Sequence, residues 1–206
     1  MNRAPRFLLS IALLASIGAP LAAQSFSDGF TFLKAVRNRD GATVQRILDN
    51  PSSTAINIRD PNTGETALHI LVGQRNLEWL AFLLSRGART DTQDNAGVSP
   101  LHLAAQIGWI EGATQLIARG ARVDVTNSRG ETPLILVVQA RQTSPAERLA
   151  MVQLLLARGA DPRRTDSFAG YSALDYARQD AQRAPEVLRA LEAQRAAPAG
   201  EVYGPN

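Results

Sequence analysis

Short apolar segments alternate with polar loops along most of the chain, and the apolar segments come in pairs. In residues 99–105 the apolar side chains follow one another at helical spacing, which predicts a short helix with a narrow apolar face. Ser99 can cap the start of that helix with its hydroxyl, and Pro100 fits its first position, where no hydrogen-bond donor is lost. Residues 110–119 predict a second helix, after which Gly120 stands where a helix-terminating glycine is common. The pattern predicts two short helices joined by a tight turn and followed by a loop.

This two-helix unit recurs at a nearly constant period. The segment that starts at Gly97 recurs once before it, at Gly64, and twice after it, at Gly130 and Gly170; the first two intervals are equal and the last is longer. An Arg-Gly-Ala triplet recurs in step, at 86–88, 119–121 and 158–160. A period of 33 with a Thr-Pro-Leu-His motif resembles the ankyrin repeat, and the resemblance covers roughly residues 30 to 194. It implies an all-α fold, an α-solenoid of about five ankyrin repeats in which each unit adds a helix-turn-helix pair and a hairpin-like loop.

The repeats are expected near 30–63, 64–96, 97–129, 130–169 and 170–194. The first lacks the Thr-Pro-Leu-His start, and the second helix expected in the last, Pro185 to Gln194, has a polar face. Both are interpreted as degenerate capping repeats, because a terminal repeat has a neighbour on one side only. Arg75 replaces the glycine that the family usually has between its two helices, so we expect a strained or reshaped turn there.

In the fourth repeat Gly130 and Gly159 are six residues further apart than the equivalent glycines of the two repeats before it, and the additional residues fall around 141–147. Ser144-Pro145-Ala146-Glu147 is a capping box with proline at the first helical position, so it predicts a second helix from Pro145 to Ala157. We interpret the insertion as a bulged loop between the two helices. A functional loop and neutral drift on an exposed turn are both compatible with it.

Residues 1–23 are typical of a cleavable secretory signal. Arg3 and Arg6 precede an apolar segment of 11 residues, and Leu21-Ala22-Ala23 offers small residues before Gln24. An uncleaved membrane anchor is the alternative, but the apolar segment is short for a span of about 20 residues. We therefore expect a periplasmic or secreted bacterial protein without membrane attachment after cleavage. Residues 24–29 are expected to be a short polar lead, and residues 195–206 a disordered tail.

Composition excludes several kinds of chemistry. The formal net charge of +3 falls to +1 once residues 1–23 are removed, and the arginines are scattered, so no nucleic-acid partner is expected. The chain has no cysteine, which removes disulfides, thiolate metal sites and thiol catalysis. No cofactor and no catalytic residue are predicted, and a monomer is expected.

The two histidines, His69 and His102, occupy the same motif position in the second and third repeats. Since neighbouring helices pack about 8–10 Å apart, the two rings cannot readily share a metal ion. Each imidazole is instead expected to bond to hydroxyl and backbone groups at a repeat junction. The residues assigned to this structural motif are Thr66, His69, Ser99, Pro100, Leu101, His102, Thr132, Pro133 and Leu134.

The resemblance implies that a protein partner contacts the hairpin tips and the first helices. Mapped onto this sequence, those regions include Gln106, Gln139 and Gln179. Six residues are predicted to bind the partner because they are apolar or cationic where the repeat does not require it: Val98, Ile107, Trp109, Arg129, Phe168 and Tyr171. Scattered surface apolar residues are the ordinary alternative for each of them.

Three functions fit these observations. The first is a non-enzymatic scaffold for protein–protein interaction in the bacterial periplasm or envelope. The second is an inhibitor or immunity protein for an envelope enzyme or toxin, and the third is a membrane-anchored structural component of the envelope. Nothing in the sequence separates the first two, whereas a persistent signal anchor would favour the third.

Overall fold

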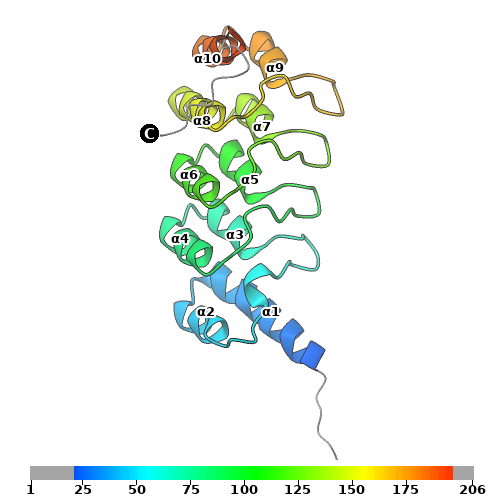
Figure 1. Ribbon diagram of the computed structural model, residues 1–206, viewed down its shortest axis with the longest axis vertical. Coiled ribbons are helices and arrows are strands. Elements are labelled where there is room, and N and C mark those ends of the chain that lie inside the picture. Colours follow the sequence, from blue (N-terminus) through cyan, green and yellow to red (C-terminus); the bar gives the residue numbers. More distant parts are fainter. Residues whose placement is uncertain (1–20, 197–206) are drawn as a thin grey trace, which may run out of the picture.

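The computed structural model describes residues 21–196 of the chain and shows helices stacked in two layers beside a row of loops (Figure 1). The helices of the described part are α1 (Leu21–Asn38), α2 (Gly41–Leu48), α3 (Ala67–Gly73), α4 (Leu77–Ser85), α5 (Pro100–Gln106), α6 (Ile110–Ala118), α7 (Pro133–Gln139), α8 (Pro145–Ala157), α9 (Ala173–Gln179) and α10 (Pro185–Ala196), with one 3-10 turn at Ala55–Asn57. Helices α3, α5, α7 and α9 lie next to the loops and form the inner layer (Figure 1). The predicted all-α solenoid of five two-helix units is therefore confirmed.

The inner helices begin where the sequence predicts. Ser99 and Thr132 are the N-cap residues of α5 and α7, and the proline after each occupies the first turn. The Thr132 hydroxyl accepts the backbone N–H of Ile135 at 3.3 Å, which satisfies one of the donors left free at a helix start.

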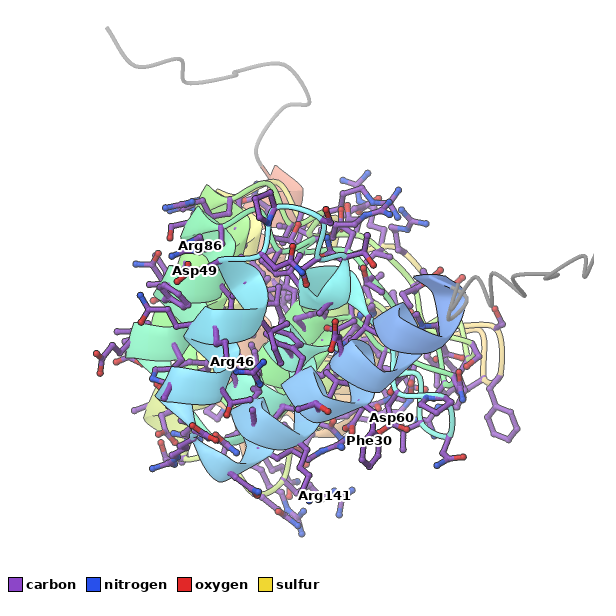
Figure 2. All side chains as sticks on the ribbon, turned by 90° about the horizontal axis from the view of Figure 1, so that it is seen from below. Phe30, Arg46, Asp49, Asp60, Arg86 and Arg141 are labelled. Carbon is purple, nitrogen blue, oxygen red and sulfur yellow. The ribbon has the colours of Figure 1, made fainter. Side chains whose placement is uncertain are left out.

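The second helices of the three middle repeats, α4, α6 and α8, end at the Arg-Gly-Ala triplets. Gly87, Gly120 and Gly159 have φ of 86°, 91° and 87°, a left-handed conformation that glycine adopts without steric cost. The arginine before each glycine caps the helix, where a cation is favoured by the helix dipole. Arg86 also pairs with Asp49 of the preceding repeat at 3.3 Å, on the outer edge of the stack (Figure 2).

The turn between the two helices needs a residue with positive φ in the first three repeats. Gly108 takes this position in the third repeat, with φ of 68°, but Arg39 and Arg75 take it in the first and second, with φ of 58° and 50°. Of the two outcomes expected at Arg75, the strained turn is found and the reshaped one is not, because a non-glycine residue takes the left-handed conformation that Gly108 has in the next repeat. The Arg75 guanidinium donates to the carbonyl of Ile107 in the next repeat, so the arginine also bridges two repeats.

The insertion in the fourth repeat is only partly a loop. Helix α8 has 13 residues where α6 has 9, and five residues separate α7 from α8 where three separate α5 from α6. Four of the six additional residues therefore extend α8, and the expected bulged loop accounts for only two. The extension is stable as a helix because the Ser144–Glu147 capping box satisfies its first donors, with Ser144 N donating to Glu147 at 3.0 Å.

The ends of the stack differ from expectation. Helix α1 begins at Leu21 and runs without interruption, so residues 24–29 are helical and do not form a separate lead. Helix α10 continues to Ala196, so residues 195 and 196 belong to the helix and not to the expected tail. The expected signal segment up to residue 20 and the tail from 197 onward lie outside the described residues.

The loops stack on one another through main-chain hydrogen bonds that recur once per repeat. The N–H of Asn95 donates to Thr63 at 3.0 Å, that of Ser128 to Ala96 at 3.0 Å and that of Ser167 to Arg129 at 2.8 Å. Beneath them one continuous apolar core runs from α1 to α10. The loop tips and the inner helices are thereby held in a fixed register along one side of the molecule.

Candidate partner-binding surface

The histidines join successive repeats. The Nε2 atom of His69 donates to the Val98 carbonyl at 2.9 Å, and that of His102 donates to the Glu131 carbonyl at 3.0 Å. Both Nδ1 atoms accept from their own N-cap residue, Thr66 or Ser99, whose backbone N–H lies 3.1 Å away. These are the hydroxyl and backbone partners that the sequence predicts. All nine residues assigned to the structural motif are buried.

These contacts require neutral rings. Burial lowers the pKa of His69 and of His102 below the ordinary value of 6.5, and the carbonyl bonds oppose that shift without overcoming it. A proton on Nδ1 would also face the N–H donor of the N-cap residue. Both ring nitrogens of each histidine are occupied by contacts within the fold. Within the described range, no group of three or more His, Cys, Asp or Glu side chains could hold a metal ion.

The prediction that Trp109 binds the partner is wrong. Its side chain is 5% exposed and belongs to the apolar core. The ring packs over Gly112 one turn later, so closely that a Cβ at Gly112 would overlap it. The sequence pattern missed this because Trp109 precedes α6 as its N-cap and falls outside the helical periodicity.

Three other predicted residues have structural contacts of their own. Val98 and Ile107 are half-buried, and Ile107 packs against the core while its carbonyl accepts from Arg75. Arg129 is exposed at the loop tip, but its guanidinium pairs with Glu131 at 2.9 Å. These three residues border the surface but do not stand free on it.

Phe168 and Tyr171, the remaining two, are the exposed aromatics of the last loop. Phe168 is 91% exposed and Tyr171 is 44% exposed. The loop that carries Phe168 is held by Asp166, whose carboxylate accepts the backbone N–H groups of residues 168, 169 and 170. Burial acts to raise the pKa of Asp166, but its hydrogen bonds from Tyr176 and from the backbone outweigh burial and lower it. Phe168 is thus presented to solvent by an ordered turn.

Tyr176 is a further member of this surface, which the sequence did not single out. Its hydroxyl donates to Asp166 at 2.7 Å, and its ring meets that of Tyr171 edge to face, with the centroids 5.5 Å apart. Burial, followed by the contact with Asp166, raises the pKa of Tyr176 to about 12. The signal was available, because Tyr176 occupies the register position of Leu103 in the third repeat, where a polar aromatic is unexpected.

The inner helices α3, α5, α7 and α9 each have seven residues, so equivalent positions form rows across them. The fourth position is an apolar row and the last is mostly glutamine: Ile70, Leu103, Leu136, Tyr176; and Gly73, Gln106, Gln139, Gln179. Between α7 and α9 these rows open into a hollow of about 510 Å³. Its lining is Val138, Gln139, Arg141, Tyr176, Gln179 and Asp180. We call the two rows, this hollow, Phe168 and Tyr171 the inner surface.

No helix in the described part of the chain combines the length and the apolarity needed to cross a membrane.

Comparison with known proteins agrees with this architecture. The protein-family model for three ankyrin repeats matches residues 32–127, and the protein-family model for one ankyrin repeat matches residues 129–167. No curated protein matches the chain. The two matches together span well over half of the sequence and include the helices that carry the histidine junctions. The chain belongs to the ankyrin-repeat family.

Proposed function

We propose that this chain, whose ankyrin repeats are modules of protein–protein interaction, is an exported, non-enzymatic scaffold. It binds a protein partner through the inner surface, chiefly at its fourth and fifth repeats. The observation that carries the proposal is Phe168, an entire aromatic side chain held in solvent by the Asp166 turn. An aromatic ring exposed on an ordered turn contributes nothing to the core, and aromatic residues dominate the binding energy of protein interfaces.

The neighbourhood of Phe168 supports an interface. Tyr171 is also exposed, Arg129 is exposed at the tip of the preceding loop, and Arg141 lines the hollow. Tyrosine and arginine are enriched at the energetic centres of interfaces, because one side chain supplies both a large contact area and polar bonds. The inner surface combines these residue types on one side of the stack.

Export rests on the signal-like sequence of residues 1–23. Cleavage after Ala23 would remove three residues from the start of α1 and would retain its buried apolar residues, Phe32, Leu33, Ala35 and Val36. The N-terminal capping repeat can therefore lose the segment without losing its core. This is compatible with a mature protein in the periplasm or secreted from the cell.

Affinity capture from the cell envelope tests the proposal. The wild-type protein and the Phe168→Glu/Tyr171→Glu variant are used as baits side by side, with Arg163→Glu, an exposed change earlier in the same loop, as control. We expect a protein that is retained by the wild type and the control and is lost with the double variant. Equal retention by all three baits would place the partner elsewhere and contradict the proposal.

A further inference from the structure

Three glutamines stand at one position of successive repeats, where the fold does not require them. Gln106, Gln139 and Gln179 are the last residues of α5, α7 and α9, and Gly73 fills the same position in α3. Gln106 and Gln179 are exposed, and Gln139 is half-buried beside the Tyr176 hydroxyl. Among the described residues, the Gln106 and Gln179 amides make no hydrogen bond to the protein. The row therefore presents amide groups to whatever occupies the inner surface.

The spacing of this row selects one kind of backbone. Neighbouring helices pack about 8–10 Å apart, so the glutamines are expected to recur at about that distance. A polyproline II segment completes one turn of three residues in about 9 Å, so it presents the same face at every glutamine. A β-strand also covers that distance in about three residues, but its faces alternate with a period of two. Successive equivalent groups of a β-strand would point alternately toward the row and away from it.

The chemistry of the row agrees with its spacing. A polyproline II backbone makes no internal hydrogen bonds, and a proline residue has a carbonyl acceptor but no N–H donor. Each glutamine amide offers two N–H donors that can reach such a carbonyl. In the adjoining row Leu103 and Tyr176 are half-buried and offer apolar and aromatic contact for the proline rings, whereas Leu136 between them is buried.

The charged residues of the hollow indicate which charge a bound segment carries there. Arg141 is exposed, lines the hollow and makes no ion pair within the described residues; in Figure 2 it projects away from the helices. Asp180 lines the same hollow, but its carboxylate faces Arg148 at 3.6 Å and Arg183 at 3.9 Å. Of the two charged side chains that line the hollow, Asp180 thus faces arginines of the fold, and Arg141 can pair with an acidic ligand group.

We propose that the inner surface binds a proline-rich segment of a protein partner in the polyproline II conformation. In this assignment Gln106, Gln139 and Gln179 donate to carbonyls one turn apart, and Arg141 pairs with an acidic residue of the segment. The assignment rests on the proposed scaffold function and names the chemistry of the partner.

The test uses the purified protein and labelled peptides, with binding measured by fluorescence anisotropy. The first peptide has nine prolines followed by one glutamate, the second replaces the prolines by glycine and serine, and the third replaces the glutamate by lysine. The variant Gln106→Met/Gln179→Met removes donors but keeps side-chain length, and Gln153→Met on the exposed face of α8 is its matched control. Arg141→Glu is matched by Arg163→Glu.

The proline–glutamate peptide is expected to bind the wild type and Gln153→Met equally, and the double glutamine variant at least tenfold more weakly. Arg141→Glu should weaken binding of the glutamate peptide and strengthen binding of the lysine peptide, whereas Arg163→Glu should change the binding of neither. Absent binding at millimolar peptide, equal binding of the glycine–serine peptide, or an unaffected double glutamine variant would each overturn the assignment.

Binding of the captured envelope partner to the variants distinguishes the scaffold proposal from the proline-segment proposal. If the partner binds Gln106→Met/Gln179→Met as tightly as the wild type but fails to bind Phe168→Glu, the scaffold function stands and the proline-segment assignment falls. If the partner binds both variants as tightly as the wild type, the inner surface is not its binding site and both proposals fall.

Discussion

The Nε2 atom of His102 lies 3.0 Å from the carbonyl oxygen of Glu131, in the repeat that follows. This bond, together with Ser99 on Nδ1, fixes the imidazole as a neutral ring that donates on one side and accepts on the other. His69 makes the same pair of contacts with Val98 and Thr66. Two neutral buried histidines therefore link the second repeat to the third and the third to the fourth.

Stability should fall as the pH falls below the ordinary histidine pKa of 6.5. Burial lowers both pKa values in the folded state, so between 6.5 and the folded pKa the unfolded chain binds more protons than the folded one. Each histidine then contributes a loss of at most about 1.4 kcal/mol per pH unit. Urea unfolding at pH 7.5, 6.5 and 5.5 measures this loss. The decrease in the free energy of unfolding per pH unit should be smaller in His69→Gln/His102→Gln. An unchanged decrease in that variant would exclude the histidines as its source.

The motif leucine and histidine should both be costly to remove. Leu101 is fully buried, so Leu101→Ala should lower the free energy of unfolding by about 2–5 kcal/mol through the cavity it leaves. His102→Ala should cost about 1–3 kcal/mol, because the Ser99 and Glu131 groups lose their partner. Denaturant titration measures both, with Gln115→Glu on α6 as a control expected within about 0.5 kcal/mol of the wild type. A loss at Leu101 no larger than that of the control would contradict its place in the core.

Two helical glycines should respond in opposite directions to alanine. A Cβ at Gly112 would overlap the buried Trp109 ring, so Gly112→Ala should destabilise the protein by about 1–3 kcal/mol. A Cβ at Gly73 meets no atom within 4 Å, so Gly73→Ala should stabilise by about 0.4–1 kcal/mol. Thermal unfolding of the two variants distinguishes them. Equal shifts would mean that Trp109 does not pack on Gly112.

The exported protein should begin near Gln24. The expected cause is removal of the charged and apolar segment of residues 1–23 by a signal peptidase. Intact-mass measurement of the protein recovered from the envelope gives the start directly. A mass that includes Met1 would favour the membrane-anchored alternative.

The periodic features were predictable from sequence because each depends on residues close in the chain. Ser99 and Pro100 specify a helix start locally, and the capping box at Ser144 placed the start of α8 at Pro145, as found. The lengths of the inserted loop and of α1 were not predictable in this way. How far a helix extends depends on what it packs against, and the sequence window holds no such information.

The surface was predicted less well than the fold. The exposure of Phe168 and Tyr171 could be predicted, because an aromatic residue in a short polar loop has no core to enter. Trp109 was misplaced because its burial depends on Gly112 leaving space, a contact that spacing alone does not reveal. Tyr176 was not singled out because its ring suits a position that is apolar in the other repeats; its hydroxyl was the available signal, and the structure shows that hydroxyl bonded to Asp166.

The affinity of the captured partner for the Phe168→Glu variant tests the central claim most directly. Phe168 is 91% exposed, so the substitution should leave the melting temperature within a degree or two of the wild type. We expect the dissociation constant, measured by isothermal titration calorimetry, to rise more than tenfold, which corresponds to about 1.4 kcal/mol. Ile107 is half-buried against the core, so Ile107→Glu should lower the melting temperature, unlike Phe168→Glu. An unchanged dissociation constant for Phe168→Glu, in a protein that melts like the wild type, would contradict binding through the inner surface.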